Sequence, residues 1–578
     1  MTKNKTEKVV ILIVAAVVLV ALVLIPLGSF IYYKVTLPPV DRVEYVRIES
    51  EDAAVPCGLN AEELQSYAED IKDDLVVTAV YGSGNEIIVA DKSYNVAFSP
   101  MPGEGEVTSA NMTYNMDVTL DVAYEAKGSM TVFADNFVEA EDGEIVGGKA
   151  QTEDNIGMAG AFDHLTPNPD DNYVKVDVYV SSAVTVKLVA RVANGNLHGA
   201  TSGGQAWMED LPLAEVCRLY LNDAETGIAQ TAIAPGTEKV DSSSWASLFT
   251  RFSDVVLGEY NLYAGKNTIK LSIIDSGNSA YDNVWGSPAG MNIDAIGVIP
   301  IARHDNATPV RLGMMGASSE YEVPTSAPLS AIKDEILGSA SVIAAIYEDG
   351  SYVSVDSADI TCSANPEFAI DAAPVGSFDV IMKYKDTSAT MTVPVTTNGK
   401  ITAENGYGMT AVGGSIRTEN GKTFAGGFNT NNMPENSVTF TVNTLSAYTA
   451  DLVLSVSNGY LVSREEGGNT YYRMEELPLG DIANITVNGK SPDLTDISLP
   501  ASVSENEDFV SLYGNFVNIT ISGVSLGEGE NTIVIDMHRS ESGLMTCWSN
   551  SNKDNDTGDN LPNESPVINV QSLEVVIK

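Results

Sequence analysis

The stretch 173-YVKVDVYV-180 decides the fold class, because apolar and polar residues alternate along it. Valines at every second position are separated by Lys175, Asp177 and Tyr179. A period of two is that of a β-strand with one buried and one solvated face. The alternation returns in the stretch 438-VTFTV-442, and further strand-like segments follow at roughly 10-residue spacing with Gly and Asn between them. The pattern predicts antiparallel β-sandwiches.

The recurrence belongs to an internal duplication. Residues 208-MEDLPL-213 return as 474-MEELPL-479, a spacing of 474 − 208 = 266 residues. The two copies run from about Val43 to Ala302 and from Pro309 to Lys578. At about 100–200 residues per domain, each copy is long enough for two domains. We therefore predict two domains in each copy, at 43–134 and 135–302, and at 309–397 and 398–578, with a linker at 303–308.

The first domain of each copy has few helical signals. Strands are predicted at 75–81 and 341–347, each followed by a turn, and each domain closes on an apolar Thr-Val strand. Asn60 and Glu63 form a capping-box pattern that predicts one short helix through Ile71. This order resembles the bacterial immunoglobulin-like domains. The resemblance implies a spacer sandwich without chemistry of its own.

The N-terminus is of a different kind. Residues 9–33 carry no charge and are rich in Val, Leu, Ile and Ala. As a helix, this stretch is long enough to cross a hydrocarbon core of roughly 30 Å. Lys3, Lys5 and Lys8 precede this stretch, so residues 1–8 are predicted to be a cytoplasmic tail. A linker, 34–42, would then lead to an extracellular bulk. A cleaved signal peptide is the rival interpretation, but the apolar run exceeds the usual ~7–15 residues and no Ala-x-Ala site follows it.

Composition excludes several classes of function. The net charge of −46 argues against nucleic acid and against an anionic membrane surface as partners. The four cysteines have no counterparts between the copies and form no CxxC pair, so neither a duplicated disulfide nor a cysteine metal site is predicted. No HExxH or Gly-x-Ser-x-Gly motif occurs. No segment remains for a catalytic domain of about 250 residues, so we do not expect an enzyme.

The second domain of the first copy opens on 138-VEAEDG-143 and closes on 292-NIDAI-296, with 264-AGKNTI-269 before the last strands. This order resembles the β-jelly-roll carbohydrate-binding modules of families 6 and 35. The resemblance implies a structural calcium held by Glu139, Glu141 and Asp294. Residues i and i+2 of a strand point the same way, so Glu139 and Glu141 can face one cation. The alternative is a solvated acidic strand end.

The second copy departs from this pattern. Thr402 replaces Glu139 and Gln571 replaces Asp294, so two of the three anionic ligands are missing and the resemblance does not extend calcium to this copy. A stretch at 552–558 looks like an EF-hand loop. Its Gly falls one position late, and Asn563 takes the place of the bidentate Glu, which favours a polar loop.

Sugar binding needs an aromatic face for the C–H side of a pyranose and polar groups for its hydroxyls. The loop before the last strand supplies such residues, and in the resembling families it borders the ligand cleft. A second cluster precedes the repeated Leu-Pro-Leu, whereas Trp245 lies in a strand-like context and is interpreted as core. The candidate ligand-binding residues are Trp285, Tyr281, Asn283 and Trp207 in the first copy, with Trp548 and Tyr472 in the second.

The predicted architecture is all-β: an N-terminal transmembrane helix followed by four β-sandwich domains in the order Ig-like, jelly roll, Ig-like, jelly roll. The expected function is that of a membrane-anchored extracellular bacterial surface protein that binds a glycan or cell-wall polysaccharide. The alternative is a structural or protein-binding surface component, such as an adhesin, without sugar binding. Binding of a glycan or of a protein partner at the cell surface separates the two hypotheses.

Overall fold

The structure is a computed structural model that describes residues 42–50, 53–90, 93–120, 126–153, 155–162, 166–200, 202–229, 232–233, 239–317, 321–428, 435–502, 510–547 and 565–578. This part of the chain is all-β apart from short helices. It forms two compact units. The first contains the described residues up to Ala317 with Ala340–Asp359 and Asp386–Ala389, and the second contains the rest. Within these ranges no helix is long and apolar enough to cross a membrane, and the predicted anchor at 9–33 lies outside them.

The first unit begins with two small sheets around one core. One has the order β1 (Val43–Glu49), β3 (Val76–Tyr81), β4 (Glu86–Ile88), and the other has the order β2 (Ala54–Val55), β7 (Lys127–Ala134), β6 (Thr113–Leu120), β5 (Tyr94–Ser99). The predicted helix is present as α2 (Ala61–Asp70), followed by η3 (Ile71–Asp74). Asn60 Oδ1 accepts hydrogen bonds from the backbone N–H groups of Glu62 and Glu63, and the Glu63 carboxylate accepts one from Asn60 N–H. The capping box sets where α2 begins.

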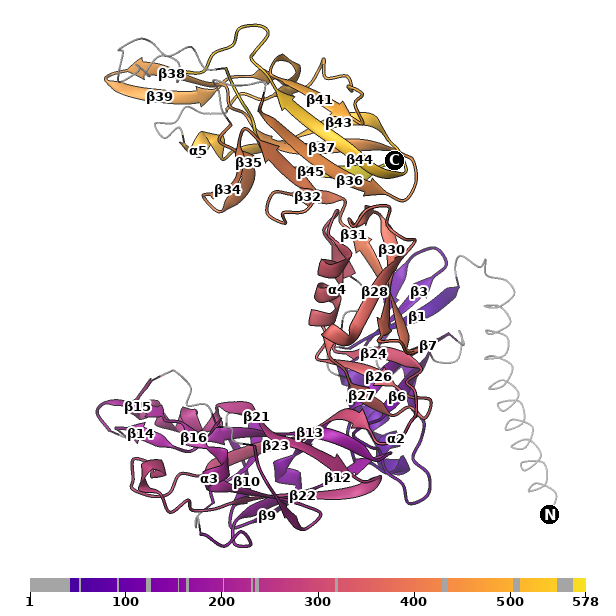
Figure 1. The fold of residues 1–578 in the computed structure, drawn as a ribbon, viewed down its shortest axis with the longest axis vertical. Helices are drawn as coiled ribbons and strands as arrows, with labels where there is room; N and C mark the ends of the chain where they lie inside the picture. Colours follow the sequence, from indigo (N-terminus) through magenta and orange to yellow (C-terminus); the bar gives the residue numbers. More distant parts are fainter. Residues whose placement is uncertain are drawn as a thin grey trace, which may run out of the picture. The chain divides into compact units, whose positions relative to one another are not determined.

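The first jelly roll consists of two antiparallel sheets, whose strands run from purple to magenta in Figure 1. One sheet has the order β10 (Lys149–Glu153), β11 (Ile156–Gly160), β23 (Met291–Arg303), β13 (Val184–Asn194), β21 (Phe252–Leu262), with β8 (Phe137–Glu139) also paired to β23. The other has the order β18 (Ala224–Thr226), β17 (Cys217–Leu221), β22 (Gly265–Ile273), β12 (Tyr173–Val180), β9 (Glu144–Val146). The half-buried strand predicted at 173–180 is confirmed as β12, because its four valines are buried while Asp177 is exposed. Each buried valine contributes about 1.5–3 kcal/mol.

A smaller cluster lies beside this sandwich. The hairpin of β14 (Leu197–Gly199) and β15 (Gln205–Met208) pairs with β20 (Val240–Asp241), which leads into the 3-10 helix η6 (Ser242–Thr250). Leu197, Ala206, Met208 and Leu248 form its buried centre, and Trp245 packs against them. Trp245 was interpreted from the sequence as a core strand residue. It is instead half-buried on η6, and one residue, Arg251, separates the end of η6 from the start of β21.

Residues 309–397 contribute to both compact units. The strands β24 (Arg311–Met315), β26 (Val342–Ile346) and β27 (Tyr352–Ser354) belong to the first unit. The second unit takes α4 (Leu329–Gly338), β25 (Tyr321–Val323), β28 (Ile360–Asn365), β30 (Ser377–Tyr384) and β31 (Thr390–Thr397). Helix α4 was not predicted. Its N-cap is Pro328, which gives no side-chain cap, and Asp371 accepts the Leu329 N–H hydrogen bond from far along the chain.

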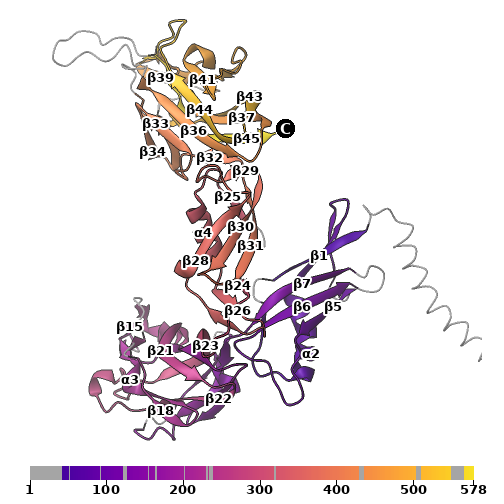
Figure 2. The same cartoon turned by 45° about the vertical axis from the view of Figure 1, so that its right-hand side comes forward.

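One sheet of the second jelly roll repeats the strand order of the first copy, and the other repeats its central strands but adds β29 (Pro374–Val375) and has no counterpart of β18. Figure 2 shows the strands of this domain in orange to yellow. One sheet has the order β34 (Ser415–Glu419), β35 (Lys422–Gly426), β45 (Asn569–Ile577), β37 (Tyr448–Ser457), β43 (Phe516–Leu526), with β32 (Lys400–Thr402) on β45. The other has the order β29, β36 (Ser437–Thr444), β44 (Gly529–Met537), β41 (Ala483–Val487), with β33 (Met409–Val412) on β36. The hairpin of β38 (Leu461–Glu466) and β39 (Asn469–Met474) extends from it. The duplication is thus one of topology as well as of sequence.

Candidate functional site

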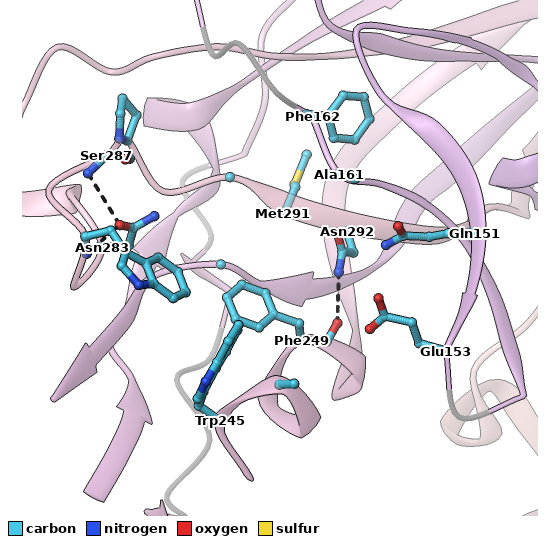
Figure 3. Close-up of a pocket in the computed structure, with 15 residues that line it drawn as sticks. Gln151, Glu153, Ala161, Phe162, Trp245, Phe249, Asn283, Ser287, Met291 and Asn292 are labelled. Carbon is cyan, nitrogen blue, oxygen red and sulfur yellow. Dashed lines mark hydrogen bonds between the residues drawn. The ribbon is translucent and has the colours of Figure 1, made fainter. Parts of the chain in front are cut away.

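A cavity of about 450 Å³ opens on the first jelly roll. Its walls come from β10, from the segment after β11, from η6, and from the loop that leads into β23 (Figure 3). It is lined by Gln151, Glu153, Ala161, Phe162, Gly195, Trp245, Ala246, Phe249, Asn283, Trp285, Ser287, Pro288, Gly290, Met291 and Asn292. Segments more than a hundred residues apart in the chain therefore meet at one site.

Two tryptophans form a corner in the wall of the cavity. Trp285 is 51% exposed, and its ring centroid lies 5.2 Å from that of Trp245, with 73° between the ring planes. Trp245 in turn packs edge-on against Phe249 at 5.9 Å, and Figure 3 shows these two rings side by side on η6. Edge-to-face packing leaves the face of an aromatic ring available to an apolar surface of a ligand. A solvent-exposed indole supported by a second ring is suited to stacking.

The backbone that carries Trp285 is held by Asn283. Asn283 Oδ1 accepts hydrogen bonds from Trp285 N–H at 3.0 Å and from Ser287 N–H at 3.4 Å. The Asn283 N–H group donates to the Ser287 carbonyl at 2.8 Å, and Gly286 N–H donates to the Asn283 carbonyl at the same distance. An asparagine that bonds to the backbone two residues ahead organises a tight turn. Asn283 therefore acts as a positioning residue for the exposed indole.

Amide side chains lie opposite the aromatic corner. Asn292 Nδ2 donates to the Phe249 carbonyl at 3.0 Å, which ties η6 to β23. Figure 3 shows Gln151 and Glu153 on the same side of the cavity as Asn292. A Cβ on Gly160 would lie 2.5 Å from Asn292 Oδ1 and 2.7 Å from Gln151 Nε2. Glycine at this position lets the two amides approach one another over the strand.

Only some of the ligand-binding residues predicted from the sequence line the cavity. Trp285 and Asn283 line the cavity, whereas Tyr281 does not. Tyr281 ends η7 (Ser279–Tyr281), and its carbonyl accepts a hydrogen bond from Ala289 N–H at 2.8 Å, so it closes the loop. Trp207 lies on β15 outside the cavity lining, with Lys239 Nζ 4.3 Å from its ring centroid.

In the second copy, Tyr472 lies on β39 and packs against Leu461, Met474 and Leu512. Trp548 lies outside the described residues. The structure therefore describes the tryptophan of the loop before the last strand only in the first copy.

Sequence reasoning missed Gln151, Glu153, Phe162 and Phe249 and did not assign Trp245 to the site. One signal was available, because Phe162 recurs as Phe428 at the same spacing as the repeated Leu-Pro-Leu segments. Both phenylalanines lie over a glycine where a Cβ would come within 2.6 Å of the ring, Gly148 in the first copy and Gly414 in the second. The repeated aromatic–glycine pair marks the same place in both sandwiches.

The three carboxylates of the calcium prediction lie near one another, at the end of β8, in the 3-10 helix η5 (Ala140–Asp142) and on β23. Glu141 lies on η5, so the prediction that Glu139 and Glu141 share one strand is wrong. Glu139 pairs in register with Ala295, next to Asp294, which is 8% exposed. Burial, and then the charges of Asp294, Glu141 and Asp135, raise the pKa of Glu139 to about 7, against the opposing charge of Arg191. Burial also raises the pKa of Asp294, although Arg191 Nη1 lies 3.7 Å from its Oδ2.

Glu141 provides a further observation. Its Oε2 is buried without a hydrogen-bond partner among the described residues, and a Cβ on Gly157 would lie 1.8 Å from its Oε1. An unpaired buried carboxylate oxygen is costly unless a cation or a donor satisfies it. Nevertheless, within the described ranges no group of three or more His, Cys, Asp and Glu side chains is arranged closely enough to hold a metal ion. All four cysteines are free thiols.

No protein-family model and no curated protein matches the chain. Among solved structures, a family 35 carbohydrate-binding module from Clostridium thermocellum aligns at 22% identity over 28% of this chain and 97% of that chain, with a TM-score of 0.19. CBM35 from Cellvibrio japonicus Abf62 aligns at 16% identity over 28% of this chain and 92% of that chain, with a TM-score of 0.18. The GH26-CBM35 β-(1,4)-mannanase of Podospora anserina aligns at 19% identity over 32% of this chain, with a TM-score of 0.18, and only 31% of the mannanase is covered.

These structure neighbours are family 35 carbohydrate-binding modules or an enzyme that contains one. The antiparallel strand pairing of the two jelly rolls places the chain among all-β proteins. The chain is an all-β, multidomain protein whose first jelly roll carries a cavity with an aromatic corner on one side and amide groups on the other.

Proposed function

We propose that the protein is a membrane-anchored bacterial surface protein that binds glycans at the cavity of its first jelly roll. The observation that carries the proposal is the 51% exposure of Trp285, whose ring lies 5.2 Å from that of Trp245, in a cavity that is also lined by Gln151 and Asn283. A pyranose has one face of C–H groups and a rim of hydroxyls. The indole suits the first and the amides suit the second.

The anchor is supported by the sequence alone. The uncharged stretch at 9–33 is long enough to span a bilayer, and lysines precede it. The bulk of the chain would then lie outside the cell, where its net charge of −46 favours solubility. Glycan or cell-wall polysaccharide is the proposed partner there, and no catalytic activity is proposed.

A structural calcium ion is proposed for the first jelly roll. Glu139, Glu141 and Asp294 would hold it, because calcium binds carboxylate oxygens, and a cation would offset the burial and the like-charge repulsion that together raise the pKa of Glu139. It would also satisfy the buried Oε2 of Glu141. When bound, the ion would stabilise the sandwich and would supply no chemistry to the ligand.

The test is a polysaccharide and cell-wall glycan array probed with the full chain and with Trp285→Ala. Loss of one stacked aromatic is expected to weaken binding about 10-fold or more. Trp207→Ala is the matched control, because it removes the same side chain from the same module outside the cavity. The proposal fails if the full chain binds no glycan, or if both variants bind as the unaltered chain does. Capture of a protein partner with no glycan bound would favour the adhesin alternative.

A further inference from the structure

The charge of the cavity bears on which sugars it accepts, and the inference that follows rests on the function proposed above. Glu153 is the one charged residue among the described residues that line the cavity. Its side chain is exposed and makes no hydrogen bond or ion pair with the described part of the chain. A carboxylate in a partly enclosed, aromatic-walled site attracts cations and repels anions.

The second copy also has a glutamate at this position, but an arginine of the same hairpin pairs with it. Glu419 takes the place of Glu153 in the equivalent hairpin, because Lys149 pairs with Gly160 in one copy and Ser415 pairs with Gly426 in the other. There, Arg417 Nη1 donates to Glu419 Oε1 at 3.1 Å. In the first copy the residue two positions before the acid is Gln151, which carries no charge.

The position beneath the Arg417 side chain also differs between the copies, and it too disfavours an arginine in the first copy. A Cβ on Gly427 would lie 1.9 Å from Arg417 Nη2, so a larger residue there would displace the guanidinium from its present position. The first copy has Ala161 at the equivalent place, with a φ of 51°. An arginine at position 151 would therefore meet the Ala161 side chain. Two positions together remove the internal cation from the first copy and leave the Glu153 carboxylate facing the cavity.

We infer that the cavity of the first jelly roll selects a glycan whose sugar carries a free ammonium group, paired with Glu153. An ammonium group donates charge-assisted hydrogen bonds to a carboxylate, which are stronger than those between neutral groups. Acidic sugars would be disfavoured, because their carboxylates would face Glu153 without a lysine or arginine among the described lining residues. The ring of the same sugar stacks on Trp285.

The test compares three oligosaccharides on the full chain at low ionic strength: glucosamine oligomers, the same oligomers fully N-acetylated, and oligogalacturonate. The glucosamine oligomers are expected to bind most tightly. Glu153→Gln should weaken their binding about 3- to 10-fold and leave the N-acetylated oligomers unaffected. Added salt should weaken the ammonium-dependent part of the affinity.

Two further variants make the comparison specific. The double variant Gln151→Arg with Ala161→Gly installs the cation of the second copy and should weaken binding of glucosamine oligomers as Glu153→Gln does. Glu225→Gln removes the same charge from an exposed strand outside the cavity and should have no effect.

Equal effects of Glu153→Gln and Glu225→Gln would overturn the inference, as would binding of the N-acetylated or galacturonate oligomers as tight as that of the amine. In either case Trp285-dependent binding of some glycan on the array would leave the proposed function standing. Absence of any glycan binding would contradict both the proposed function and the inferred preference for an amino sugar.

Discussion

Replacing Asn283 with alanine tests whether the exposed indole is held by the turn beneath it. The variant removes the acceptor of two backbone hydrogen bonds, one of 3.0 Å from Trp285 N–H and one of 3.4 Å from Ser287 N–H. The second is long, and water can replace the partner of both donors because the loop is at the surface. The net loss is therefore about 1 kcal/mol, and glycan binding should weaken by up to about fivefold, because the turn is formed in a smaller fraction of the chains.

Affinity for the glycan identified on the array is the first measurement, and near-ultraviolet circular dichroism is the second. The dichroism should change, because the 5.2 Å contact between the Trp245 and Trp285 rings depends on the turn. Asn278→Ala is the control, since Asn278 Oδ1 accepts a similar hydrogen bond from Ala280 N–H at 3.1 Å, outside the cavity lining. Unchanged dichroism and affinity in Asn283→Ala, or equal losses in both variants, would refute the reasoning.

Two further predictions concern stability. Glu139 has an ordinary pKa of 4.5 that is raised to about 7 in the folded chain, so the stability it contributes is fully present below 4.5 and is lost as the pH rises through 7. Calorimetry should show this loss in the unaltered chain, by no more than about 1 kcal/mol because the group is partly solvated, but not in Glu139→Gln. Added calcium should restore the loss at pH 7.5, and a melting temperature unaffected by calcium or chelator would contradict the calcium proposal. In the same unit, Tyr352 is 1% exposed and its hydroxyl donates to Asn136 Oδ1 at 2.6 Å. Tyr352→Phe should lower the free energy of unfolding by about 1–2 kcal/mol in chemical denaturation. The control Tyr263→Phe, at a residue 71% exposed, should lower it by much less, and similar losses in the two variants would count against the packing described.

The two copies share a scaffold and differ where a ligand would lie. The sheet that carries β23 in the first copy and β45 in the second has the same strand order in both, yet Gln151 of the first copy is Arg417 in the second, and Asp294 is Gln571. The apolar core positions are constrained by packing between the two sheets, whereas Gln151 on β10 and the buried Asp294 on β23 are polar positions outside that apolar core. Such a duplication suits two sites of different preference better than two equal sites.

Local patterns were enough to predict several of the elements. The alternation in 173–180 gave a half-buried strand because every second side chain of a strand shares one face. Asn60 and Glu63 predicted where α2 begins, because a capping box involves only neighbouring residues. The loop with Trp285 and Asn283 was also found, since both residues lie in one short stretch.

What the sequence by itself determined was therefore the all-β class, the duplication, one helix start and one wall of the candidate site. Only the tertiary structure decided the rest. Trp245 contacts Trp285, and Glu153 and Asn292 line the same cavity, across separations in the chain that carry no periodic signal. Helix α4 depends on Asp371, which is distant in the chain and reaches its first turn only in the fold. Periodicity reports which face of an element is buried, but a binding cavity forms where ends of distant elements converge, and that convergence is a property of the packed sheets.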